Sequence, residues 1–173
     1  MPRITTKDLL FVSKAKKERL DSLAAGVSLR IRTRRNIPAL VTLATRDRIA
    51  LARSLLRHAQ INAGDPRPVF RCAVGRAYYS MYHCFRAVSY YTHGGDDHEE
   101  HTVLPSRIPN DFPNRDVWEN NLKNARLERN RADYDPYPRQ DRRFEVVATD
   151  VIQKARLLIP IAVQYLRSKG CRL

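Results

Sequence analysis

The sequence predicts an all-α protein, an antiparallel four- to five-helix bundle with a basic N-terminal extension. Apolar residues recur at intervals of three and four along several long segments, which is the period of a helix that buries one face. The chain has no Gly-rich turn of the kind that joins a strand to a helix, and no internal repeat. Amphipathic helices joined in series bury their apolar faces by packing on one another, so a bundle is the expected architecture.

Residues 1–44 are predicted to form the extension and residues 45–173 the bundle. Residues 1–57 contain fourteen Lys and Arg but only four Asp and Glu, a surplus of ten within a net charge of +14. Clustered positive charge indicates a polyanionic partner, with nucleic acid as the main candidate. A solvated extension that aids solubility is the alternative interpretation.

Within the extension, residues 6–24 are predicted to form a helix that Thr6 caps and Gly26 ends. Residues 27–44 have two interpretations. Apolar residues alternate with arginine over a few positions, as in a strand. The same residues also fit a basic linker that Pro38 interrupts.

The first helix of the bundle is predicted to begin at Thr45. Its apolar face includes Ile49, Leu55 and Ala59, and the Asn-Ala-Gly-Asp-Pro stretch that starts at Asn62 ends it. Because this helix and the next are joined by a short turn, they are expected to pack as antiparallel neighbours.

A second, longer helix is predicted from about Pro68 to Tyr91. One stripe of this helix is apolar and belongs to the core. A second stripe repeats at intervals of 3, 4, 3 and 4, which keeps its members on one side of the helix. This stripe is too polar for a core and too aromatic for a free surface, so it predicts a symmetric homodimer through the long helices. The stripe consists of Arg76, Tyr79, His83, Arg86 and Tyr90.

Residues 92–115 are predicted to form a long loop, because Gly, Pro, Asp and His dominate them. The third helix is expected to start at Asp116 as the N-cap, with Glu119 completing a capping box. The last helix is predicted over residues 142–166, where Pro160 is expected to kink it.

Arg129 is the strongest candidate for binding chemistry. It shares a helix face with Trp118 and Leu122, so its side chain is expected to point inward near the end of the third helix. An arginine beside short polar groups can grip a phosphate through two parallel hydrogen bonds. Asp133 follows four residues later, where it either pairs with Arg129 or acts with it.

Other polar and aromatic groups have simpler interpretations. Tyr78, Tyr79 and Tyr82 lie among core positions, which favours packing over base stacking. The loop from His93 to His101 is rich in acids and histidines, but it lacks a fixed ligand spacing, so we assign no metal and no cofactor.

Three cysteines without a paired spacing fit a reducing, cytoplasmic location. No stretch approaches the ~20 apolar residues that cross a bilayer, and the first residues do not form a secretory signal, so no membrane partner is expected.

Three segments in a fixed order resemble the HEPN-domain family over about residues 45–168. Arg76 to His83 is similar to the family's R-x-YY-x-M-[FY]-H pattern, and His101 matches a histidine that follows the loop. Residues 129–135 match R-N-x-A-D-Y, a segment found in small bacterial and archaeal HEPN proteins that are encoded beside minimal nucleotidyltransferases.

The resemblance implies a dimeric, metal-independent endoribonuclease that serves as a toxin or defence effector of a two-gene toxin–antitoxin system. An arginine would bind the scissile RNA phosphate while a ribose 2′-hydroxyl attacks it. The implied catalytic candidates are Arg129, Asp133, Tyr134 and His83. The implied RNA-binding candidates are Arg76, Arg86 and Arg131.

The chain departs from the R-x4-6-H motif of active family members, because Tyr134, Asp135 and Pro136 occupy the window after Arg129. A tyrosine with a pKa near ~10 is a poor base at neutral pH. His83 is a substitute if the bundle brings it to the groove, and otherwise a structural residue. The alternative function is a non-catalytic HEPN module that binds nucleic acid or a nucleotidyltransferase partner.

The resemblance also implies regulation by a cognate nucleotidyltransferase-type antitoxin, which adds AMP to a tyrosine after the motif. The candidates are Tyr137 and Tyr134. Tyr137 is favoured, because Pro136 and Pro138 are expected to hold it in an extended, accessible loop. Tyr134 is expected to pack against the helix end.

Overall fold

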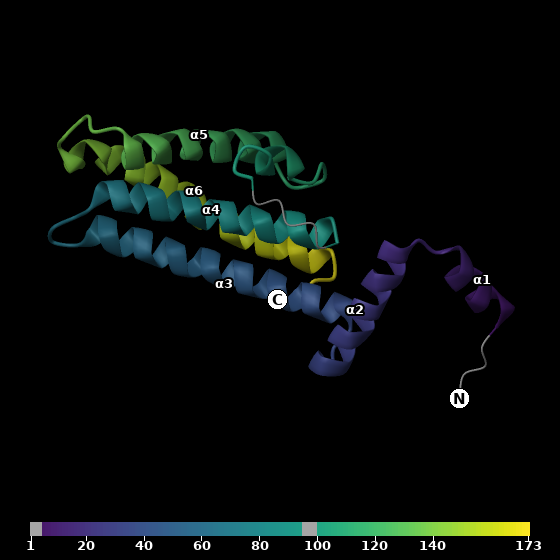
Figure 1. Cartoon of the computed structure of the whole chain (residues 1–173). Coiled ribbons are helices and arrows are strands. Elements are labelled where there is room, and N and C mark those ends of the chain that lie inside the picture. Colours follow the sequence, from purple (N-terminus) through teal and green to yellow (C-terminus); the bar gives the residue numbers. More distant parts are fainter. Residues whose placement is uncertain (1–4, 95–99) are drawn as a thin grey trace. The chain divides into compact units, whose positions relative to one another are not determined.

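A computed structural model of the chain describes residues 5–94 and 100–173, and every regular element in these ranges is helical (Figure 1). The chain divides into two compact units, Met1–Leu40 and Val41–Leu173. Two short 3-10 helices, η1 and η2, accompany six α-helices. The elements are α1 (Thr6–Lys14), α2 (Lys17–Thr33), α3 (Ile37–Gly64), α4 (Phe70–Thr92), η1 (Leu104–Arg107), α5 (Arg115–Tyr134), η2 (Asp141–Phe144) and α6 (Glu145–Ser168).

The N-terminal unit differs from the predicted single helix over residues 6–24. A capping box starts α1 one residue earlier than predicted, with Asp8 N donating to Thr5 Oγ1 at 3.2 Å and Thr5 N donating to Asp8 Oδ2 at 2.9 Å. The helix stops at Ala15, whose backbone is extended, and α2 begins two residues later. Gly26 lies inside α2 and does not end it, since one glycine costs a helix only about 1 kcal/mol.

The prediction of a strand or linker over residues 27–44 is also wrong. Helix α2 continues to Thr33, and α3 begins at Ile37 rather than at Thr45. Asn36 accepts a hydrogen bond from Ala39 N at 2.9 Å and so caps α3. Pro38 falls in the first turn, where a residue needs no backbone donor.

In the unit Val41–Leu173, consecutive helices run in opposite directions, as an antiparallel bundle requires (Figure 1). Helix α4 is the central element, with 14 of its 23 residues buried, and it packs on both α5 and α6. Its small residues allow close approach to a neighbour, as where Ser80 Oγ donates to Ala52 O of α3 at 2.7 Å. The core includes Tyr78, Met81, Phe85, Leu122, Leu158 and Leu166.

Helix α5 does not start with the predicted capping box. Its N-cap is Asn114, in the left-handed region at φ 52°, and Asp116 lies inside the first turn. There Asp116 lies 3.2 Å from Arg115 Nη1, and Glu119 pairs with the same arginine at 3.3 Å. Both acids therefore offset the charge of Arg115. They also interact favourably with the positive end of the helix dipole, but neither of them caps the helix.

At the end of the bundle that holds the last turn of α5, the first residues of α4 form hydrogen bonds with the chain that follows α5. Asp141 accepts hydrogen bonds from the backbone N–H groups of Phe70 at 2.5 Å and Arg71 at 3.0 Å, so it caps α4 from a distant part of the chain.

Within the described residues, none of the helices is long and apolar enough to pass through a bilayer.

Candidate functional site

Arg129 lies on the inner side of α5, with only 17% of its side chain exposed. Its Nη2 donates to Tyr79 Oη of α4 at 2.6 Å, and its Nη1 donates to Asn130 Oδ1 at 3.1 Å. Because α5 continues to Tyr134, Asp133 lies one turn after Arg129, and its Oδ2 is 2.7 Å from Arg129 Nε. The predicted inward direction and the pairing with Asp133 are therefore confirmed.

The guanidinium of Arg129 retains capacity for a ligand. It has five N–H groups; Tyr79 and Asn130 accept from two of them, and Tyr134 is a further hydrogen-bond partner. The N–H of Nε lies close to Asp133 as an ion pair, but it is not aligned with an acceptor among the described residues. Burial works to lower the pKa of Arg129, but Tyr79, Asp133 and Tyr134 raise it by more, so the group stays charged.

A cavity of about 330 Å³ opens beside Tyr79 and Asp133. Gly75 leaves its wall open, since a Cβ atom there would lie 3.5 Å from Asp133 Oδ1. Arg76 is exposed on the same rim, so the cavity combines a cation, a phenol and a carboxylate. The lining residues are Asn62, Val69, Cys72, Gly75, Arg76, Tyr79 and Asp133.

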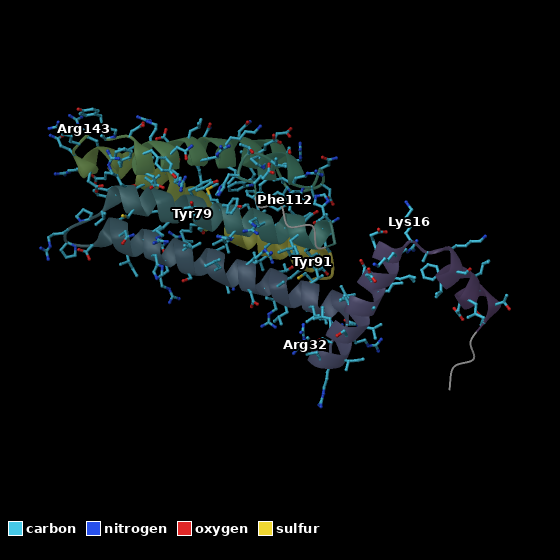
Figure 2. All side chains as sticks on the ribbon, in the orientation of Figure 1. Lys16, Arg32, Tyr79, Tyr91, Phe112 and Arg143 are labelled. Carbon is cyan, nitrogen blue, oxygen red and sulfur yellow. The ribbon has the colours of Figure 1, made fainter. Side chains whose placement is uncertain are left out.

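Tyr79, which Figure 2 labels on α4, also belongs to an aromatic cluster. The ring of His101 stacks on Tyr82 with centroids 4.2 Å apart and an interplanar angle of 15°. The same imidazole meets the ring of Tyr79 edge-on at 5.9 Å, and His83 lies 6.5 Å from that ring. Both histidines therefore adjoin the residue that holds Arg129.

His101 is anchored in this cluster through Tyr78, whose hydroxyl lies 2.5 Å from His101 Nδ1. Burial lowers the pKa of His101, and the positive charges of Arg129, Arg126 and Arg86 lower it further. The imidazole is thus neutral at physiological pH within a cationic environment. From the sequence, His101 was a match to a family pattern, and nothing local indicated its contacts with α4.

Of the other predicted site residues, Arg86 adjoins the aromatic cluster and Arg131 does not contact it. Arg86 lies over the ring of Tyr82 at 5.5 Å, and Arg131 pairs with Glu128 at 3.1 Å. Tyr82 is buried, as predicted for packing, and so is Tyr78. The polar stripe of α4 also makes contacts within the chain, because Arg48 of α3 lies 4.3 Å over the ring of Tyr90.

The two tyrosines that follow Arg129 are both accessible. Tyr137 is 66% exposed, with the guanidinium of Arg139 over its ring at 5.7 Å. Tyr134 is 70% exposed, so the expectation that it packs against the helix end is wrong. As the last residue of α5 its ring stays at the surface, where the guanidinium of Arg129 lies 5.3 Å from its centroid.

Arg71 is a residue that the sequence did not single out. Its Nη1 donates to Ala132 O at 2.7 Å and to Asp135 O at 2.8 Å, and its Nη2 donates to Pro138 O at 2.7 Å. The guanidinium also lies 4.3 Å over the ring of Phe144. This one side chain satisfies carbonyls at the end of α5 and holds the segment that carries Tyr137.

The acidic, histidine-rich loop from His93 to His101 cannot be followed as a group, because Asp96, Asp97, His98 and Glu99 lie outside the described residues. Among residues 5–94 and 100–173, the structure has no cluster of three His, Cys, Asp or Glu that would hold an ion.

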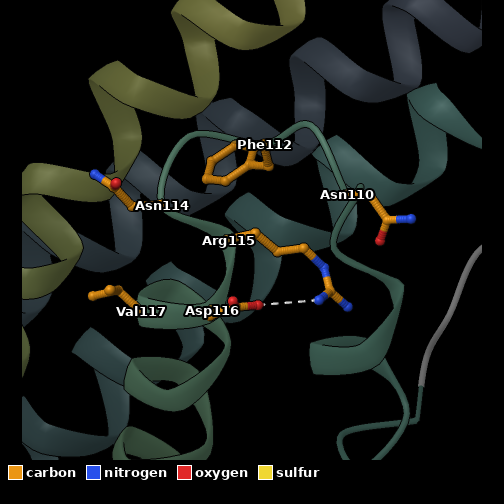
Figure 3. A pocket seen from close by; sticks show the side chains of 6 residues that line it. All are labelled: Asn110, Phe112, Asn114, Arg115, Asp116 and Val117. Carbon is orange, nitrogen blue, oxygen red and sulfur yellow. Dashed lines mark hydrogen bonds and ion pairs between the residues drawn. The ribbon is translucent and has the colours of Figure 1, made fainter.

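A second cavity, of about 610 Å³, lies at the start of α5 and is shown in Figure 3. Asn110, Phe112 and Asn114 line it together with the first residues of the helix. Its cation is engaged, since Arg115 pairs with Asp116 and donates from Nε to Ile108 O at 3.0 Å. The smaller cavity differs in that an exposed arginine, Arg76, lines it, and two of its lining residues, Tyr79 and Asp133, contact Arg129.

No family model, curated protein or solved structure matches this chain. The functional interpretation therefore depends on the site's own residues and geometry.

Proposed function

We propose that this chain is a HEPN-type, metal-independent endoribonuclease that acts as a toxin or defence effector in a two-gene system. The observation that carries the proposal is the hydrogen bond between Arg129 and Tyr79. These residues belong to two segments that resemble the family, 50 positions apart in the chain. Their meeting makes one site out of two separate sequence matches.

In the proposed reaction, Arg129 binds the scissile phosphate through N–H groups that the protein leaves available. The neighbouring ribose 2′-oxygen attacks phosphorus, the bond to the 5′-oxygen breaks, and a 2′,3′-cyclic phosphate forms. The 2′-hydroxyl proton goes to solvent, and the leaving 5′-oxygen takes a proton from solvent. Because RNA supplies the nucleophile, the protein contributes positioning and positive charge.

Asp133 and Tyr79 serve this reaction by orienting the guanidinium before RNA arrives. An arginine that is held in place loses less rotamer entropy on binding than a free one. Arg76, exposed on the rim of the adjoining cavity, extends the cationic surface for the RNA backbone.

The proposal also includes a homodimer and a cognate nucleotidyltransferase as partners. AMP added to Tyr137 would place a negative charge close to the end of α5 and compete with RNA for the cationic site. Tyr137 is exposed enough to be the acceptor, as is Tyr134, and the basic residues of the N-terminal unit support RNA binding by charge.

A non-catalytic HEPN module is the second candidate, and the ion pair between Arg129 and Asp133 favours it. The carboxylate offsets the charge that a phosphate would need, and no histidine occupies the window from Tyr134 to Pro136. Such a module would bind RNA or its partner protein through the same surface without cutting.

The exposed Cys72 provides a direct test, because it lines the cavity beside Asp133, whereas Cys84 and Cys171 are buried. A single-stranded RNA should protect Cys72 from a maleimide reagent, and Arg129→Ala should remove both protection and cleavage. Arg156→Ala, which deletes an exposed arginine of α6, is the matched control and should behave as the wild type.

EDTA should leave cleavage by the wild type unchanged, whereas a 2′-deoxy substitution at the cut site should abolish it. Protection of Cys72 without any cleavage would favour the non-catalytic module. Arg129→Ala protein that still cuts RNA at the wild-type rate would refute the proposed site.

A further inference from the structure

His101 has a defined tautomer because of its contact with Tyr78. The phenol of Tyr78 is 1% exposed, and burial raises its pKa, so the hydroxyl keeps its proton. His101 Nδ1, at 2.5 Å, is the hydrogen-bond partner that the structure describes for this hydroxyl. If Nδ1 instead carried the proton, the buried phenol hydrogen would lose this acceptor, at a cost of about 1–3 kcal/mol. Tyr78 therefore donates to Nδ1, and the neutral ring carries its hydrogen on Nε2.

The direction of that Nε2–H follows from the shape of the imidazole. The two nitrogens lie on different edges of the ring, so Nε2 points away from the buried Tyr78. Stacking on Tyr82 at 4.2 Å and the edge contact with Tyr79 at 5.9 Å fix the plane of the ring. His101 is half-buried, which leaves part of the ring accessible to a ligand.

Among the residues that the structure describes, the charges that act on His101 are cations from two helices. Arg86 comes from α4, and Arg126 and Arg129 come from α5. The aromatic groups that face the ring are Tyr78, Tyr79 and Tyr82 of α4. A neutral donor among cations adds a hydrogen bond for an anion without adding repulsion among the positive groups.

We propose that His101 Nε2–H is a phosphate ligand of the Arg129 site, donating a hydrogen bond to the same RNA phosphate that Arg129 binds. The inference rests on the proposed function for the identity of the anion. It assigns His101 to binding rather than to proton abstraction, because a nitrogen that already carries a hydrogen cannot accept one from the ribose.

Nitrogen-15 NMR of the histidine side chains gives the first test. The signals of His101 are identified by their loss in His101→Gln. Nδ1 should have the shift of a hydrogen-bonded acceptor, and Nε2 that of an N–H nitrogen. A 2′-deoxy-substituted oligonucleotide, which cannot be cut by this chemistry, should move the Nε2–H signal and raise the pH at which His101 titrates. A proton on Nδ1 in the free protein would overturn the inference.

Two variants of His101 separate the roles of its nitrogens. The amide of His101→Gln reaches the position of Nε2 and retains a donor there, whereas the shorter His101→Asn reaches only the position of Nδ1. Binding of the same oligonucleotide should stay within about threefold of the wild type for His101→Gln. It should weaken about tenfold for His101→Asn, the value of one hydrogen bond to a charged group.

Equal affinities for the two variants, whether both retained or both lost, would overturn the inference. If one variant fails to fold, Tyr78→Phe replaces it, because it preserves packing but removes the donor to Nδ1. The pKa of His101 should then rise, and an unchanged titration would overturn the assigned tautomer.

The proposed function is tested separately by Arg129→Ala in the same binding assay. An unchanged affinity would show that the RNA phosphate does not bind at this site, and it would refute both proposals. Lost affinity in Arg129→Ala, with equal affinities for the two His101 variants, would refute the role of His101 alone.

Discussion

Replacing Arg71 by alanine tests how the end of the bundle that holds Arg129 is stabilised. The substitution removes three short hydrogen bonds, to the carbonyls of Ala132, Asp135 and Pro138, and the contact with Phe144. All of them depend on the planar fork of one guanidinium, so a single change removes every one of these side-chain contacts, while the backbone hydrogen bonds of Phe70 and Arg71 to Asp141 remain.

The expected loss of stability follows from these contacts. Charge-assisted hydrogen bonds contribute about 1.5–3 kcal/mol each, and a cation over an aromatic ring adds about 0.5–1 kcal/mol. Arg71 is half-buried, and water can replace part of what the carbonyls lose, so the low end of each range applies without full additivity. We therefore expect Arg71→Ala to lower the free energy of unfolding by about 2–4 kcal/mol, and Tm by about 6–12 °C.

Urea and thermal unfolding, followed by far-UV circular dichroism, measure this change. Arg71→Lys retains the charge and one donor direction, so it should lose roughly half as much. Arg67→Ala is the matched control, because it removes an exposed arginine of the loop between α3 and α4. Its free energy of unfolding should stay within about 0.5 kcal/mol of the wild type. Arg71→Ala protein as stable as the control would refute the interpretation of Arg71 as a structural connection.

Three further predictions concern acid stability, RNA binding and regulation. The hydrogen bonds from Lys169 and Tyr165 lower the pKa of Asp111. Its carboxylate therefore stabilises the fold at any pH above the ordinary pKa of an aspartate, and this stabilisation is lost as the pH falls through the lowered pKa of the folded state. Denaturant unfolding should show a smaller loss between pH 7 and pH 2 for Asp111→Asn, and an identical loss would contradict this. Deleting residues 1–40 should weaken RNA binding. It should also reduce the slope of log affinity against log salt concentration by roughly one unit for each phosphate that the extension neutralises. An unchanged slope would show that the extension does not contact the RNA backbone. Co-expression with an active cognate nucleotidyltransferase should add the mass of AMP at Tyr137 and not in Tyr137→Phe, and persistence of the mass in that variant would exclude Tyr137.

The bundle could be predicted from the sequence because its helices are long and their apolar residues keep one period. Ile49, Leu55 and Ala59 of α3 lie in predicted core positions and are buried. The ends of helices were harder to predict, since several residues with similar capping ability compete. Thr5, not Thr6, caps α1, and Asn114, not Asp116, precedes α5.

Contacts between neighbours in sequence could also be predicted, whereas contacts between distant residues could not. Asp133 lies one helical turn from Arg129, so spacing alone indicated the ion pair. The stacking of His101 on Tyr82 depends on how residues after α4 return to the bundle, and no local pattern encodes that path. Arg71 was missed for another reason, because its acceptors are backbone carbonyls, which every residue possesses.

The connections of Phe70 and Arg71 have a consequence for folding kinetics. The hydrogen bond from Phe70 N to Asp141 joins residues 71 positions apart, and that from Arg71 to Ala132 joins residues 61 positions apart. Such contacts form only when α4 has met α5 and the segment that follows α5, after the loop-closure entropy has been lost. We therefore expect φ-values near zero here. Arg71→Ala should accelerate unfolding and leave the folding rate almost unchanged, so this end of the bundle would control how long the folded state lasts rather than how quickly it forms.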